Sequence, residues 1–204
     1  MDNGQLIMDN SPASKASPDL ETVPPGYKRT EVGVIPEDWN PTKIDQIGDV
    51  KSGKRLPYGY ALSDNPTPHP YIRVSDMFAG GVDASNILYV PEKAFSSIKN
   101  YRIFVGDIFI SVAGTLGIVG TVPPELNGAN LTENADRVTN LKCHQNYLLY
   151  WLSSFPVQRN IESIQTVGAQ PKLALGRIKD FVIALPPSLP EQRAIAEALS
   201  DVDR

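Results

Sequence analysis

Three polar segments of the chain carry residue types that suit contacts with nucleic acid. The first spans residues 51–60 and contains the cations Lys51, Lys54 and Arg55, followed by Tyr58 and Tyr60. Cationic side chains neutralise phosphates, and arginine or aromatic side chains can reach base edges and sugar faces. An ordinary polar surface loop has a similar composition, and composition alone favours that alternative.

Side-chain amides dominate the second and third segments, residues 127–134 and 165–172. Amides make paired hydrogen bonds to adenine, so Asn130 and Gln170 are candidates for reading bases. Lys172, at the end of the third segment, is a candidate for a phosphate contact. An ordinary surface loop is the alternative here too.

Residue sets for catalysis are sparse. The sequence has two histidines, His69 and His144, and one cysteine, Cys143, so the paired ligand spacing of a structural zinc site is missing. A small buried side chain is the favoured interpretation of Cys143. Pro186 and Pro187 lack the polar residue before them and the aromatic residue after them that an adenine methyltransferase needs. We therefore expect neither catalysis nor a metal on this chain.

The segment from Gly114 to Gly120 leaves one enzymatic alternative open. Its glycine spacing does not match a phosphate loop, no lysine follows, and no convincing helix opens after it. A hairpin turn whose glycines permit positive φ is favoured, although such a turn, which includes Thr115, can also bring backbone N–H groups close to a phosphate. The alternative function is a small nucleotide-binding or transferase domain that uses this turn.

Composition limits the class of protein. The chain has 204 residues, of which 41% are hydrophobic, so it can bury a core and is not wholly disordered. Its 15 glycines and 18 prolines favour a loop-rich α/β or α+β chain over a helical bundle. We expect no membrane span and no secretory signal, and the single cysteine favours a reducing cytoplasm.

The net charge of −4 argues against a free-standing nonspecific nucleic-acid binder, which is usually basic. The charge is uneven, however, because residues 141–187 carry five cations against two carboxylates. A polyanion would therefore be bound by local patches, with help from a partner.

Hydrophobic periodicity predicts the elements that position these segments. Alternation predicts a strand at 71–74, which includes Arg73, and a strand at 107–112 that returns through the glycine turn as a hairpin with 118–122. The apolar run at 181–185 predicts the last buried strand.

Helical spacing predicts one buried face on a helix over residues 145–155. That face consists of Tyr147, Leu148, Trp151, Leu152 and Phe155. Pro156 is expected to interrupt this helix before a short second helix at 157–164.

A final helix is predicted to begin at Ser188, where a serine, an early proline and Glu191 form a start signal. Ala194, Ile195, Ala198, Leu199 and Val202 then form one apolar stripe. A helix of about four turns has little to pack on beyond a domain edge or another chain. Ile195, Leu199 and Val202 are therefore predicted to face a partner helix.

The order of these pieces resembles one half of the DNA-specificity subunit of a type I restriction-modification system. The resemblance starts at residues 27–39 and continues through 51–54, 71–77, 106–117 and 168–173. It is most specific over 183–196, where an apolar strand leads through a double proline and a Pro-Glu-Gln sequence into a helix. The ordered set covers roughly residues 26–204.

The resemblance implies an α+β fold in which a mixed-sheet target-recognition domain is followed by the start of a long conserved helix. It implies a noncatalytic module that reads one half of a bipartite site in double-stranded DNA. Methyltransferase subunits, and through the complex a restriction subunit, would be its partners. S-adenosylmethionine, ATP and Mg would be bound by those partners only, so no cofactor is expected on this chain.

We accordingly divide the chain into a flexible tail (1–25), a target-recognition domain (26–187) and a truncated dimerisation or spacer helix (188–204). The chain has one recognition domain, so it is either an isolated half or a natural half-subunit that pairs weakly with its own copy. The candidate DNA-binding residues are Lys51, Lys54, Arg55, Tyr58, Tyr60, Arg73, Thr115, Asn130, Gln170 and Lys172.

Overall fold

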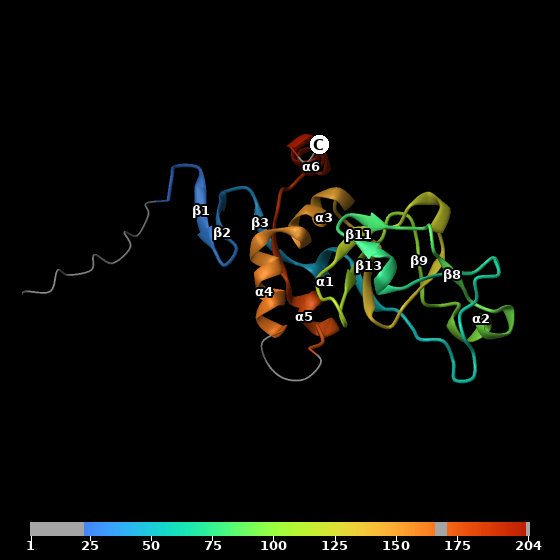
Figure 1. Cartoon of the computed structure of the whole chain (residues 1–204). Helices are drawn as coiled ribbons and strands as arrows, with labels where there is room; N and C mark the ends of the chain where they lie inside the picture. The colour runs from blue at the N-terminus through green and yellow to red at the C-terminus, as the bar shows by residue number, and fades with distance from the viewer. Residues whose placement is uncertain (1–22, 166–170, 203–204) are drawn as a thin grey trace, which may run out of the picture.

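The structure is a computed structural model that describes residues 23–165 and 171–202 (Figure 1). The chain is elongated, with the hairpin of β1 and β2 near one end and α2 at the other. Almost all of the predicted tail, and Gln170, lie outside the described residues. Within the described part, no helix combines the length and apolar character needed to cross a membrane.

Strands and helices alternate irregularly along the chain. The strands are β1 (Tyr27–Thr30), β2 (Gly33–Pro36), β3 (Asn40–Lys43), β4 (Asp49–Ser52), β5 (Pro70–Ile72), β6 (Met77–Phe78), β7 (Gly81–Val82), β8 (Leu88–Tyr89), β9 (Arg102–Ile103), β10 (Ile108–Ser111), β11 (Val119–Thr121), β12 (Ala129–Leu131), β13 (Ala135–Thr139) and β14 (Val182–Leu185). The helices are α1 (Ile44–Ile47), α2 (Glu92–Ile98), α3 (Gln145–Ser153), α4 (Phe155–Gln165), α5 (Leu175–Asp180) and α6 (Leu189–Val202), with 3-10 turns η1 (Val74–Asp76) and η2 (Pro124–Leu126).

Two four-stranded sheets form the centre of the fold. One is antiparallel in the order β11-β10-β13-β4. The other has the order β8-β5-β12-β9 and is mixed, because β12 runs parallel to β5 and antiparallel to β9. Short two-stranded pairs join β1 to β2, β3 to β14 and β6 to β7. The predicted α+β class with a mixed sheet is confirmed.

Strand β10 separates two hydrophobic clusters, which explains its alternating sequence. Ile108 and Ile110 lie in the larger cluster with the helices α1, α3, α4 and α5, whereas Phe109 lies in the second cluster with β5 and β12. The predicted hairpin with β11 is present, and Phe109 pairs with Gly120 across it. A Cβ at Gly120 would collide with the Phe109 ring, so this position needs glycine.

The predicted helix over 145–155 is shorter than expected. Helix α3 ends at Ser153, because Ser154 is extended and its hydroxyl bonds back to the carbonyl of Trp151. Phe155 therefore starts α4, with Pro156 in the first turn where a missing N–H costs little. As a result Phe155 is exposed, and its assignment to the buried face was wrong.

Helix α6 is attached to the domain by the polar side chains at its start. The Ser188 hydroxyl accepts a hydrogen bond from the Glu191 N–H, as the start signal predicted. The Glu191 carboxylate accepts from the Trp39 indole instead of completing a capping box. Buried Gln192 accepts from the His144 N–H at 2.8 Å and donates to the Pro186 carbonyl at 2.9 Å. The Glu-Gln pair thus fixes α6 against α3 and the strand before it.

Candidate nucleic-acid interface

Parts of the chain that are distant in sequence meet at one end of the antiparallel sheet. The Lys54 N–H donates to the Leu131 carbonyl at 2.8 Å, and the Val112 N–H donates to the Asn134 carbonyl at 2.7 Å. The Leu173 N–H donates to the Val112 carbonyl at 2.9 Å. We call the surface made by residues 53–62, 113–117, 132–134 and 171–173 the loop edge. It contains six of the ten predicted DNA-binding residues.

Those six side chains are exposed. They are Lys54, Arg55, Tyr58, Tyr60, Thr115 and Lys172. Tyr58 is fully exposed, and Thr115 lies in the turn between β10 and β11. Lysine and arginine beside exposed tyrosine form the mixed cationic and aromatic surface that can contact phosphates, sugars and bases.

Glu133 organises the first loop, a role that was not predicted from the sequence. Its carboxylate accepts a hydrogen bond from Arg55 at 2.6 Å and lies 3.5 Å from the hydroxyl of Tyr71. Burial raises the pKa of Glu133, but hydrogen bonds from Arg55 and Thr132 outweigh this and hold it below its usual value. The ionised carboxylate therefore keeps Arg55 in place, although an exposed pair of this kind contributes little stability.

Lys51 is separate from the loop edge. It lies on β4 opposite Arg137 of β13, and its ammonium group is 3.3 Å from the carboxylate of Asp49. Lys99 and Arg102 lie near Lys51 in the fold, and neither was among the predicted DNA-binding residues. No local sequence pattern points to them. Lys99 follows α2 and Arg102 opens the two-residue strand β9, so both are far from β4 in sequence.

One predicted contact needs correction, and a second is already engaged within the protein. Asn130 is 1% exposed in the middle of the mixed sheet, and its amide donates to the Ile98 carbonyl at 2.7 Å. It therefore cannot reach a base in this structure. Arg73 donates to both carboxylate oxygens of Asp76 and to the Asn86 carbonyl. Its guanidinium thus stabilises the turn after β5, and its DNA contact stays a prediction.

The structure does not support the catalytic alternatives. Burial raises the pKa of the Cys143 thiol to about 11, which makes it a poor nucleophile. The segment from Gly114 to Gly120 is a hairpin turn that leads into β11 and opens no helix, so the nucleotide-binding alternative is not supported. Among the described residues, no group of three or more His, Cys, Asp and Glu is placed to hold a metal.

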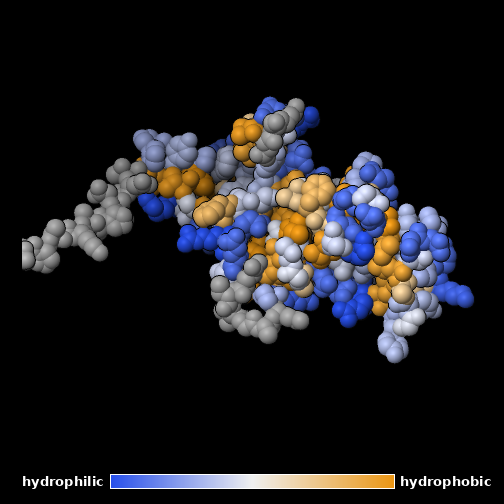
Figure 2. Space-filling view, in the orientation of Figure 1, coloured by the Kyte–Doolittle hydropathy of each residue, from blue (hydrophilic) through white to orange (hydrophobic). Residues whose placement is uncertain are grey.

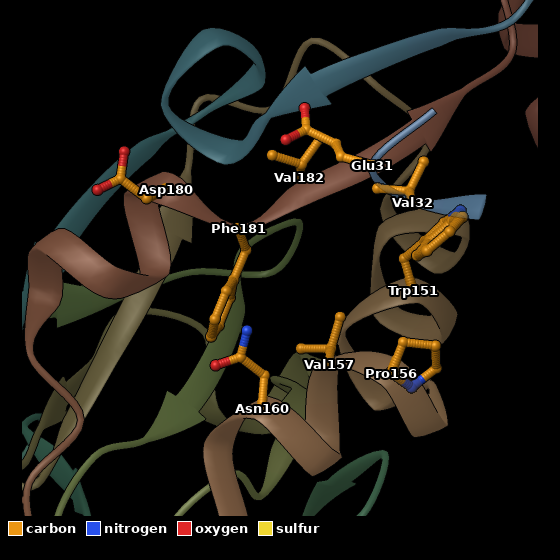
Figure 3. Close-up of a pocket in the computed structure, with 9 residues that line it drawn as sticks. All are labelled: Glu31, Val32, Trp151, Pro156, Val157, Asn160, Asp180, Phe181 and Val182. Atoms are coloured by element: carbon orange, nitrogen blue, oxygen red, sulfur yellow. The ribbon is translucent and has the colours of Figure 1, made fainter. Parts of the chain in front are cut away.

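A different concavity of about 280 Å³ lies between the β1–β2 turn, α4 and the start of β14 (Figure 3). Figure 3 shows Phe181 pointing toward Asn160, with Glu31 and Asp180 at the rim. Lys43 pairs with Asp180 at 2.7 Å, and this hydrogen bond lowers the pKa of Asp180. Lys43 thus neutralises the Asp180 charge, and the pocket presents no free cation for a phosphate among its lining residues.

The stripe on α6 is largely uncovered. Leu199 is 42% exposed and Val202 83% exposed, and Figure 2 shows hydrophobic residues on the outer surface of this helix. Ile195 and Leu199 border an apolar groove of about 260 Å³ that Trp39, Tyr150 and Trp151 also line. The face that α6 turns toward the domain carries Gln192 and Ala196 instead.

Residues 36–204 match the family described as the type I restriction modification DNA specificity domain. The chain belongs to this family. It is 32% identical over 188 residues to the putative type I restriction enzyme MjaX specificity subunit of Methanocaldococcus jannaschii, with 87% of this chain and 42% of the relative covered. It is 26% identical to the type I restriction enzyme EcoBI specificity subunit of Escherichia coli, with 83% and 36% covered.

Solved structures have the same fold as this specificity domain. The HsdS subunit from Thermoanaerobacter tengcongensis aligns with a TM-score of 0.64 at 16% identity, over 87% of this chain and 40% of that one. A chain from a study of type I R-M complex assembly and conformational transition aligns with a TM-score of 0.65 at 18% identity, over 83% and 39%. The specificity domain thus spans about two fifths of the relatives it matches.

Proposed function

We propose that this specificity domain reads one half of a bipartite sequence in double-stranded DNA, as one target-recognition domain of a type I restriction–modification specificity subunit. The observation that carries the proposal is the overlap between the family match and the loop edge. The match covers residues 36–204 and so includes every segment that brings exposed cations and tyrosines together. Recognition of a sequence needs both kinds of group, because phosphate contacts position the protein and base contacts specify the site.

The charge of the chain supports recognition within a complex. The chain as a whole is acidic, at −4, so only local cationic surfaces can attract DNA. We therefore propose that the isolated domain binds DNA weakly and that partner subunits supply the remaining affinity. Tight, sequence-selective binding by this chain alone at physiological salt would contradict this part of the proposal.

We further propose that the partners are methyltransferase subunits and, through the complex, a restriction subunit. The exposed Leu199 and Val202 of α6 support a helix partner on that face. The chemistry, with S-adenosylmethionine, ATP and Mg, belongs to those partners in this proposal, and the chain itself is noncatalytic. We place the assembly in the cytoplasm, which agrees with a single buried cysteine.

Mapping methylated adenines in cells that carry the complete system tests the proposal. Tyr58→Ala should relax one half of the methylated bipartite sequence and leave the other half unchanged, because only one recognition domain is altered. Tyr58 is fully exposed, so its removal should not disturb the fold. Tyr27→Ala is the matched control, since Tyr27 is also exposed but lies on the hairpin at the other end of the chain.

The proposal is contradicted if the methylated sequence stays the same in Tyr58→Ala and in a variant that combines Lys54→Gln, Arg55→Gln and Thr115→Ala.

A further inference from the structure

A cavity of about 270 Å³ lies beside the loop edge, between the antiparallel sheet and the segment that leads into β9. Its walls include four cationic side chains from four different places in the chain. They are Lys51 of β4, Lys99 after α2, Arg102 of β9 and Arg137 of β13. The predicted DNA-binding set contained only Lys51.

Two of the four cations, Lys99 and Arg102, form no ion pair within the described residues. Lys51 pairs with Asp49, and Arg137 lies close enough to the carboxylates of Asp107 and Asp136 to interact with their charge. Cations that line one concavity without matching carboxylates repel one another, and they favour an anion that occupies the space between them.

Two of the cations are already held in place. Arg137 is nearly buried, and its guanidinium donates to the carbonyls of Ser52 and Asn100 at 3.3 and 3.2 Å. Arg102 donates from Nε to the Lys99 carbonyl at 3.0 Å, and its guanidinium lies 5.2 Å from the centre of the Phe104 ring. Neither terminal nitrogen of Arg102 has a hydrogen bond within the described residues. Side chains fixed in advance lose less entropy when they bind a ligand.

The cavity is close to the loop edge, because Lys51 in its wall precedes Lys54 on the same segment. Lys54 follows Lys51 by three residues, which corresponds to about 10 Å along an extended chain. The Lys54 ammonium group lies 5.7 Å from the ring of Tyr101, which connects Asn100 to Arg102 at the cavity wall. About 10 Å is the rise of roughly three nucleotides along one DNA strand. A strand that touches the loop edge can therefore place another of its phosphates at the cavity.

We propose that the cavity between Lys51, Lys99, Arg102 and Arg137 is a phosphate-binding site that holds the DNA backbone beside the loop edge. This inference rests on the proposed function and adds to it a site that contacts backbone and not bases. The site fixes the position of the domain on the duplex, and the loop edge reads the sequence.

The test measures how salt weakens the binding of the 204-residue chain to short duplexes of random sequence, by fluorescence anisotropy. A combined Lys99→Gln and Arg102→Gln variant should lower the slope of log K against log salt by ~1.8, because each lost phosphate contact removes ~0.9. The loss of affinity should be the same for all duplexes. Lys93→Gln removes a similar exposed charge from α2 outside the cavity and should leave the slope unchanged.

Each result decides between the two proposals. If the combined variant keeps the wild-type slope while Lys54→Gln with Arg55→Gln lowers it, the cavity does not hold DNA and the proposed function stands. If the wild-type chain does not bind duplexes even at low salt, the phosphate site is overturned, while the map of methylated adenines still decides the proposed function. Inorganic phosphate is also tested on the wild type and on the combined Lys99→Gln and Arg102→Gln variant. If it raises the melting temperature of the wild type only, while the two proteins have equal salt slopes for DNA binding, the cavity binds free phosphate and not DNA.

A folding defect must be separated from a lost contact. Arg102 packs on Phe104, so its replacement could disturb the wall of the cavity. Lys99→Gln alone changes an exposed side chain and should lower the slope by ~0.9 with unchanged unfolding in urea. An unchanged slope in this single variant contradicts the inference whatever the double variant does.

Discussion

At the loop edge the polar side chains point into solvent, whereas under α6 they bind the protein itself. Lys54, Tyr58 and Lys172 are exposed at the first surface. At the second, Gln192 bridges two backbone groups, and the Trp39 indole donates to Glu191 at 3.0 Å. The two regions therefore use side chains of similar polarity for different purposes.

This difference separates motifs that maintain the fold from residues that contact a ligand. The Pro-Glu-Gln sequence is the most distinctive part of the chain, yet the Gln192 side chain is buried and makes internal hydrogen bonds. The exposed loop residues carry weaker sequence signals, because any surface loop can contain lysine and tyrosine. Substitutions in the two regions should consequently affect different measurements.

The largest loss of stability is expected from Gln192→Ala. The change leaves the His144 N–H and the Pro186 carbonyl without their partner in a buried setting. We expect the free energy of unfolding to fall by about 2–6 kcal/mol, since two buried groups lose their partner and each costs about 1–3 kcal/mol. Urea unfolding measures this.

The neighbouring residue provides the control. Arg193→Ala removes an exposed pair with Glu197 and should leave the unfolding free energy almost unchanged. Equal losses in the two variants would show that Gln192 does not anchor α6.

The next effect is expected at the loop edge, from Gly53→Ala. A Cβ at this position would meet the carbonyl oxygen of Thr132 and lie 2.7 Å from its carbonyl carbon. The backbone must move apart, at a cost of about 1–3 kcal/mol. Because Lys54 and Arg55 follow directly, the same change should also weaken DNA binding. Gln192→Ala should bind DNA like the wild type under conditions in which the variant is still folded.

Gly176→Ala is the matched control for this prediction. Gly176 lies in α5, and nothing lies within 4 Å of its added Cβ. Alanine should raise the unfolding free energy by about 0.4–1 kcal/mol. If Gly53→Ala raises the unfolding free energy as Gly176→Ala does, the close approach of Gly53 to the Thr132 backbone has no structural role.

Local sequence predicted those parts of the fold that depend on neighbouring residues. The hairpin of β10 and β11 follows from alternation and a glycine turn, and α6 follows from its start signal. Asn130 was misassigned because its burial depends on β5 and β9, which pair with it from distant positions. The cationic cavity could not be predicted for the same reason, since its four cations come from separate elements.

The smallest change in stability is expected from Leu199→Glu on α6. Leu199 is already 42% exposed, so the folded chain gains only part of the ~1.5–3 kcal/mol that full burial of a leucine provides. The helix is held mainly through Gln192 and Ala196 on its other face. We expect the unfolding free energy to fall by about 1 kcal/mol or less.

The same variant tests what the exposed stripe does. About four turns with alanines at 194 and 198 offer little apolar area, so the wild type should remain a monomer at micromolar concentration. Light scattering over a dilution series should give one mass for both proteins. Copurification with a methyltransferase subunit should be lost in Leu199→Glu and kept in Arg193→Ala. A dimer that persists on dilution would contradict the predicted monomer. If Leu199→Glu lowers the unfolding free energy by more than about 2 kcal/mol, the domain itself buries the stripe, and α6 has no free face for a partner.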